Sequence, residues 1–173
     1  MSKRYLMLAV LVAASAPGIA AGFNKLELFR SIGLAEGEWI TTYAIEDVTV
    51  TPGPANQADP ATADKARALL SQKGRVQETT DCLGNNLAAN GDLILPGAAI
   101  AASCPITSQN VSSGDFAFTA MCGDKLRTTV TFEAAKTSTT IDGTVNINIE
   151  SEELSTAIRT RFNSRRVRAC DEG

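Results

Sequence analysis

Apolar and polar residues alternate along much of the chain with a period of two. The segments 115–122 (DFAFTAMC), 128–132 (TTVTF) and 144–150 (TVNINIE) show this pattern most clearly. Such alternation is typical of antiparallel strands that bury one face and leave the other in water. Two earlier segments predict further strands. Residues 38–51 are rich in β-branched and aromatic residues and form either one long strand or two short ones, and residues 74–82 supply another strand, entered through Gly74.

Turn residues separate several of these segments. Ser-Gly-Asp at 113–115 and Asp142-Gly143 are both expected to connect strands. The pattern as a whole predicts a mainly β fold, an antiparallel meander of about six to eight strands. We expect a curved sheet or a half-barrel, and the sequence leaves open whether the sheet closes.

Two segments depart from the strand pattern. Asp59 and Pro60, followed by the good helix formers of 61–73 and then Gly74, predict one short surface helix inserted between strands. The segment 83–103 combines small residues with helix and strand breakers, so it predicts a long irregular connection.

The first twenty residues have the pattern of a signal peptide. Lys3 and Arg4 precede an uncharged, mostly apolar run at 5–16, and small residues follow it. The apolar run has about a dozen residues, whereas a membrane-spanning helix needs about 20. We therefore expect cleavage after Ala20 or Gly22 and a periplasmic or secreted protein.

The predicted organisation is a signal peptide at 1–20 and a single β-rich domain at 21–173. The whole sequence has a formal net charge of −3 and only 5% aromatic residues. Nucleic-acid-binding proteins usually carry a basic footprint, so this composition argues against such partners. No apolar stretch after residue 20 is long enough to span a bilayer.

All four cysteines follow the predicted signal peptide: Cys82, Cys104, Cys122 and Cys170. An even number in an exported protein predicts two disulfides, and four cysteines permit three pairings. We favour Cys82–Cys104, which would close the irregular connection, and Cys122–Cys170, which would tie the last strand to the sheet. Cys170 is therefore interpreted as a structural cysteine rather than a reactive thiol.

The sequence contains no histidine, which excludes Ser-His-Asp and Cys-His catalysis and histidine-ligated metals. It also lacks the usual nucleotide-binding and calcium-binding motifs, so we predict no catalytic set, no cofactor and no metal site. An enzyme would have to use carboxylates or lysine. The candidates for that alternative lie near predicted loops or strand ends: Glu46, Asp47, Asp81, Asp92 and Lys125.

Arginines are concentrated near the C-terminus: Arg159, Arg161, Arg165, Arg166 and Arg168. The segment 154–162 fits a strand and also a short helix, and Asn163-Ser164 is expected to form a bulge or turn. The arginines could form an anion-binding patch, but we favour charges that protect an edge strand from aggregation. Trp39, the sole tryptophan, is expected in the core with its indole N–H satisfied.

Several short elements follow one another in a fixed order: Gly37 to Thr42 (GEWITT), Cys82-Leu83, Cys104, Cys122, Asp142-Gly143, Arg165-Arg166-Val167 and Cys170. This order resembles the bacterial exported family catalogued as domain of unknown function 3617, over roughly residues 34 to 170. Arg168 stands where that family usually has glycine. The resemblance implies export, β structure and paired cysteines, and it implies no activity.

The sequence does not determine a function. We favour a non-enzymatic module that binds an apolar ligand or a component of the cell envelope. The alternatives are a carboxylate or lysine enzyme acting on an envelope substrate, and a purely structural envelope protein.

Overall fold

The computed structural model describes residues 32–54, 59–84, 104–123 and 126–170. The predicted signal peptide lies outside these residues, as do Asp92, Lys125 and most of the predicted irregular connection. The described elements are one helix and seven strands: β1 (Gly37–Pro52), α2 (Pro60–Leu70), β2 (Val76–Leu83), β3 (Ile106–Val111), β4 (Asp115–Cys122), β5 (Arg127–Lys136), β6 (Thr140–Glu150) and β7 (Leu154–Arg168).

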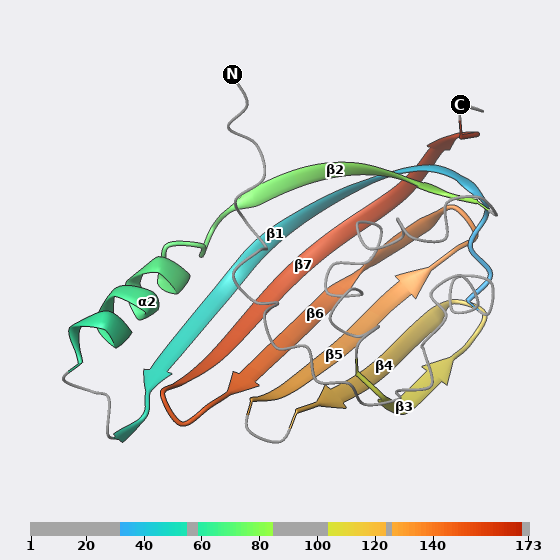
Figure 1. Ribbon diagram of the computed structural model, residues 1–173. Helices are drawn as coiled ribbons and strands as arrows, with labels where there is room; N and C mark the ends of the chain where they lie inside the picture. The colour runs from blue at the N-terminus through green and yellow to red at the C-terminus, as the bar shows by residue number, and fades with distance from the viewer. Residues whose placement is uncertain (1–31, 55–58, 85–103, 124–125, 171–173) are drawn as a thin grey trace.

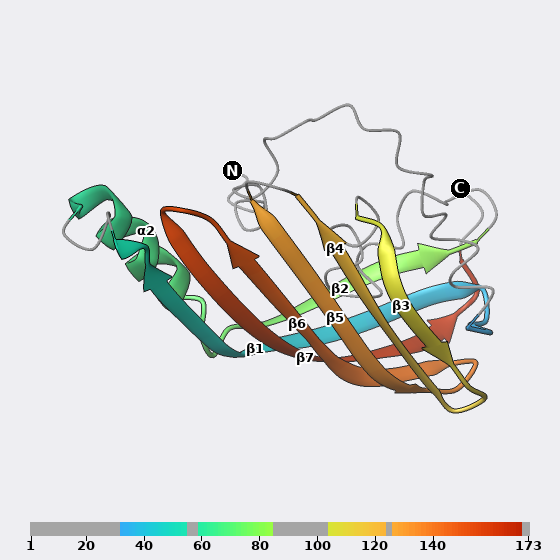
Figure 2. The same cartoon turned by 90° about the horizontal axis from the view of Figure 1, so that it is seen from below.

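All seven strands belong to one antiparallel sheet with the order β2-β1-β7-β6-β5-β4-β3. Strands β3 to β7 follow one another as a meander, and β1 lies between β7 and β2. The sheet is bent into an open trough with β2 and β3 as its two edges (Figures 1 and 2). The prediction of a curved antiparallel meander is confirmed, and β1 is one long strand.

The alternation of side chains separates an apolar face from a polar face. On the apolar face, Phe132 lies at the centre of an aromatic cluster, with ring centroids 4.8 Å from Phe116, 5.2 Å from Phe118 and 4.9 Å from Phe162. All four rings are buried, and the aliphatic side chains packed around them are buried or, at Ile106 and Ile147, partly buried. This cluster joins β4, β5 and β7 across the middle of the sheet.

Asp142-Gly143 is not a turn, contrary to the prediction, because it lies within β6. The chain instead reverses between β5 and β6 at 137–139, where the N–H of Thr137 donates to the carbonyl of Thr140. Gly143 lies opposite Phe162 in the sheet, and an added Cβ would lie 2.6 Å from the Cβ of Ala134. Glycine is therefore needed here for close packing of neighbouring strands.

The last strand agrees with the prediction in part. The segment 154–162 adopts the strand of the two predicted alternatives, but it continues through Asn163-Ser164 without the predicted bulge or turn. The register shifts between β1 and β7 lie instead at Glu38/Trp39 and Ile45/Asp47. Strand β7 is also not an edge strand, because it pairs with β1 on one side and β6 on the other.

Helix α2 is confirmed and stands beside the end of β1 (Figure 1). It begins because the Asp59 carboxylate accepts hydrogen bonds from both the N–H and the hydroxyl of Thr62, at 2.8 and 2.7 Å. Pro60 supplies the backbone angle that suits the first turn. Those two hydrogen bonds hold the pKa of Asp59 below its usual value.

The two disulfides join Cys82 to Cys170 and Cys104 to Cys122, so the pairing we favoured from the sequence is wrong. Strands β5 and β6 separate β4, which carries Cys122, from β7. At about 4.8 Å per strand, β4 and β7 are about 14 Å apart. A disulfide requires Cα atoms about 4.4 to 6.8 Å apart, which the observed pairs satisfy at 5.9 and 4.8 Å.

Each disulfide ties a particular part of the sheet. Cys82 of β2 and Arg168 of β7 lie on either side of Glu38 in β1. Cys170 is two residues after Arg168. The Cys82–Cys170 bond therefore connects edge strand β2 to the end of β7, past β1. The Cys104–Cys122 bond closes the β3–β4 hairpin at the end opposite its turn.

Candidate functional site

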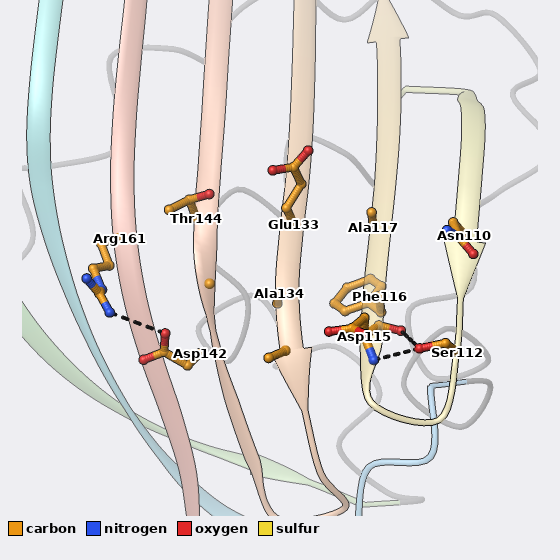
Figure 3. Close-up of a pocket in the computed structure, with 12 residues that line it drawn as sticks. Asn110, Ser112, Asp115, Phe116, Ala117, Glu133, Ala134, Asp142, Thr144 and Arg161 are labelled. Atoms are coloured by element: carbon orange, nitrogen blue, oxygen red, sulfur yellow. Dashed lines mark hydrogen bonds and ion pairs between the residues drawn. The ribbon is translucent and has the colours of Figure 1, made fainter.

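The polar face of the sheet contains an open hollow of about 590 Å³. It lies over strands β3 to β7 near the β3–β4 turn (Figure 3). The lining residues are Asn110, Ser112, Asp115, Phe116, Ala117, Glu133, Ala134, Ala135, Asp142, Gly143, Thr144 and Arg161.

Small residues create the hollow. Ala117 and Ala135 line it on the polar face, where their strand partners are Glu133 and Asp115. Longer side chains from neighbouring strands stand around Ala117 (Figure 3). Glu133 faces Ala117 on one side and Thr144 on the other, because cross-strand partners lie directly opposite. The depression is therefore a direct result of where alanine falls in the strand register.

Three carboxylates stand around Ala135. Asp115 and Asp142 are its partners on the two neighbouring strands, which places their Cα atoms about 10 Å apart. Glu133 projects from the same strand as Ala135, two residues away and on the same face. All three acids are exposed.

Asp142 has two polar partners on β7. One oxygen lies 3.5 Å from the Arg161 guanidinium, and the other accepts a hydrogen bond of 3.2 Å from the Asn163 amide. Within the described part of the chain, Asp115 and Glu133 have no ion-pair partner. Three carboxylates and one guanidinium leave a formal charge of −2 around the hollow.

The hollow suits binding better than acid–base catalysis. Paired-carboxylate enzymes need one acid in an apolar, desolvated setting and a second acid in a different environment. Here the three acids share one open, solvated surface. The arrangement can accept hydrogen bonds from cationic groups and does not distinguish an acid from a base.

The structure separates the five arginines that the sequence groups together. Arg159, Arg161 and Arg165 project from the polar face, whereas Arg166 has the opposite orientation and donates from Nε to the Glu36 carbonyl at 2.6 Å. Arg168 lies beyond the register shift between Glu38 and Trp39, and its guanidinium is close to the carboxylate of Glu38.

Three of these five arginines lie next to carboxylates. Arg159 lies 3.3 Å from Glu46, Arg161 lies 3.5 Å from Asp142, and Arg168 lies 2.9 Å from Glu38. These contacts offset the positive charge. Arg165, which is exposed, is therefore the main remaining candidate for binding an anion.

Among the described residues, the carboxylates proposed for an enzyme, Glu46, Asp47 and Asp81, do not form one site. Glu46 pairs with Arg159, and Asp47 lies 2.7 Å from Lys73, whose ammonium group keeps the pKa of Asp47 below its usual value. Asp81 on β2 faces Trp39, about seven residues along β1 from Glu46, or about 23 Å. Glu46 and Asp47 therefore share no cleft with Asp81.

Trp39 is a core residue, as predicted. Its side chain is 0% exposed, and its indole N–H donates to the Ala35 carbonyl at 3.1 Å. The hydrogen bond ties the chain just before β1 to the core, beside the buried Ile32 and Leu34. Trp39 is thus a packing residue and is inaccessible for stacking on a ligand.

Sequence reasoning missed Asp115, Glu133 and Asp142 as a group. They are far apart in the sequence, and the β4–β5 and β5–β6 registers are needed to place them around Ala135. The available signal was their shared position on the polar side of the alternation, with alanine at the neighbouring polar positions. That signal identifies the face of the sheet and cannot identify the register.

Within the described ranges, no helix is long and apolar enough to cross a membrane. The same residues contain no group of three or more His, Cys, Asp or Glu side chains arranged to hold a metal ion. A family model described as "Protein of unknown function (DUF3617)" matches residues 34–170. Neither the curated proteins nor the solved structures provide a match.

Proposed function

The chain belongs to the DUF3617 family, and from this premise and the geometry of the polar face we propose that it is an exported, non-enzymatic binding module. The hollow around Ala135 is the proposed binding site. Its ligand is a cationic group, either an ammonium or a guanidinium, presented by a component of the cell envelope.

The charge around the hollow carries this proposal. Asp115 and Glu133 offer carboxylate oxygens without a cation from the described chain, and a ligand cation would supply the missing charge. Asn110 and Thr144 add hydrogen-bonding groups at the rim. A guanidinium suits this setting because its planar array of donors can contact carboxylates on two sides.

An apolar ligand fits the described residues less well. The large apolar side chains of the sheet are packed against one another, and Trp39, Phe116, Phe132 and Phe162 are at most 1% exposed. The hollow is on the opposite face and has carboxylates at its rim. A polar partner is therefore favoured over a lipid-like ligand.

Export is supported by two independent features. The sequence of residues 1–20 has the pattern of a signal peptide, and the four cysteines form two disulfides. Disulfides persist in the periplasm and outside the cell and are rare in the cytosol. Periplasmic or secreted location predicts that intact-mass spectrometry of the native protein finds a chain shortened by 20 or 22 residues.

Titration with the peptide Arg-Ala-Arg-Ala-Arg, followed by calorimetry at low salt, tests the binding function. Exposed ion pairs each contribute about 0.2 to 1 kcal/mol, so we expect millimolar affinity that weakens as salt is added. Ala135→Leu should weaken binding at least about fivefold, equivalent to about 1 kcal/mol, because leucine fills the hollow.

Ala157→Leu is the matched control, since Ala157 is also exposed on the polar face but lies four residues from Arg161 along β7, about 13 Å away. It should leave binding unchanged. Equal affinity of Ala135→Leu and the unaltered protein would contradict the proposed site. If the peptide Glu-Ala-Glu-Ala-Glu bound more tightly than Arg-Ala-Arg-Ala-Arg, the result would instead support the arginines as an anion-binding patch.

A further inference from the structure

Strand β3 is an exposed edge of the sheet. Within the described residues it pairs only with β4, and five of its six residues are exposed, from Thr107 to Val111. An open strand edge presents unpaired N–H and C=O groups that can bind another strand. The outer backbone groups of β3 are therefore candidates for pairing with another strand.

The two edges of the sheet differ in their protection. Edge strand β2 carries the charged residues Glu78 and Asp81, and the disulfide at Cys82 holds its end. Strand β3, with the sequence ITSQNV, contains no charge, proline or glycine. Charges, proline and β-bulges are the usual means of preventing edge-to-edge pairing. Strand β3 has no charge or proline, and its register shift lies at its start, between Ile106 and Ser108.

The hairpin turn determines which backbone groups of β3 point outward. The N–H of Ser112 donates to the carbonyl of Asp115, so these two residues form a hydrogen-bonded pair at the turn. In an antiparallel ladder, hydrogen-bonded and non-hydrogen-bonded pairs alternate. The backbone groups of Asn110 therefore face β4, and those of Gln109 and Val111 face outward.

We propose that two copies of the chain pair through β3, antiparallel to each other, about a two-fold axis at Gln109. The two seven-stranded sheets then form one continuous sheet. Gln109 faces Gln109 of the second copy, and Val111 faces Thr107 of the second copy. On the polar face, Ser108 lies opposite Asn110 of the second copy.

A second copy is favoured as the occupant because β3 is complementary to itself. In a two-fold antiparallel pair, a charged residue on the axis would face the same charge of the second copy, and Gln109 on the axis is uncharged, as is the rest of β3. Val111 is 37% exposed, although its partner in β4, Phe116, is buried. Pairing would cover Val111 and extend the core across the axis.

Sedimentation velocity of the disulfide-bonded protein over a concentration series tests this proposal. The expected result is a reversible monomer–dimer equilibrium whose dimer fraction increases with concentration and dominates at the highest concentrations. Gln109→Lys and Gln109→Glu should each remain monomeric there, because like charges then meet at the axis. An equimolar mixture of these two variants should restore the dimer mass.

Gln109→Pro should also be monomeric, because it removes a backbone N–H that points outward from the sheet edge. It should keep the fold, because the backbone N–H groups that face β4 are unchanged. Thr80→Lys, on the other edge strand, is the control and should dimerise normally. The proposal is overturned if the unaltered protein stays monomeric throughout. It is also overturned if either charged variant dimerises alone, or if Thr80→Lys abolishes the dimer.

Discussion

Removing each disulfide separately should show that the two bonds contribute unequally to stability. In the loop-entropy model, a cross-link stabilises by restricting the unfolded chain, and the effect grows with the length of the closed loop. The cysteines are 88 residues apart in the Cys82–Cys170 bond and 18 apart in the Cys104–Cys122 bond. These separations correspond to about 4.6 and about 3.2 kcal/mol, respectively.

Two double variants isolate these contributions, Cys82→Ser with Cys170→Ser and Cys104→Ser with Cys122→Ser. Urea denaturation should give a free energy of unfolding lower by about 1.4 kcal/mol in the first variant than in the second. The melting temperatures should differ in the same direction by about 3 to 6 °C. Hydrogen exchange should increase in β2 in the first variant and in the β3–β4 hairpin in the second.

Single substitution gives the sharper test of the connectivity. Cys170→Ser should leave Cys82 as the thiol that can be alkylated, and Cys104 and Cys122 should stay linked. An alkylated Cys122 in that variant would refute the pairing. Equal or reversed stability losses in the two double variants would refute the loop-entropy argument while leaving the pairing intact.

Three further changes test the packing and capping of the fold. Gly143→Ala should lower the free energy of unfolding by about 1 to 3 kcal/mol, because the new methyl meets Ala134; unchanged urea denaturation would contradict this. Trp39→Phe should cost about 1 to 3 kcal/mol by leaving the Ala35 carbonyl without its indole donor, and circular dichroism during denaturation measures the loss. The pKa of Asp59 is lower in the folded protein than in the unfolded chain, so its ionised carboxylate stabilises α2 at pH values above the unfolded pKa of about 3.9. This stabilisation is lost as the pH falls through the folded pKa. Amide shifts of α2 should therefore change below about pH 4, and Asp59→Asn should remove that change; identical acid titrations would refute the capping role.

Local patterns in the sequence were sufficient to predict most of the sheet. Alternation of apolar and polar residues identified the strand that ends at Cys122 and the one that ends at Glu150, and Asp59 with Pro60 identified the helix start. These features depend on residues close together in the chain. Strand β3 was missed because it is an exposed edge, so its sequence need not alternate.

Predictions that required register or strand order were less successful. The favoured pairing of Cys122 with Cys170 ignored the two strands that separate β4 from β7. Asp142-Gly143 has the composition of a turn, but close packing against Ala134 also requires glycine. The hollow was beyond prediction for the same reason, because its carboxylates meet only through the registers of neighbouring hairpins.

The most direct test of the proposed binding site is two-dimensional ¹H–¹⁵N NMR during titration with Arg-Ala-Arg-Ala-Arg. The account predicts the largest amide shifts around the hollow, at Asp115, Glu133, Ala135 and Thr144, with little change on β2. Shifts concentrated away from the hollow, or no saturable shifts at low salt, would contradict it.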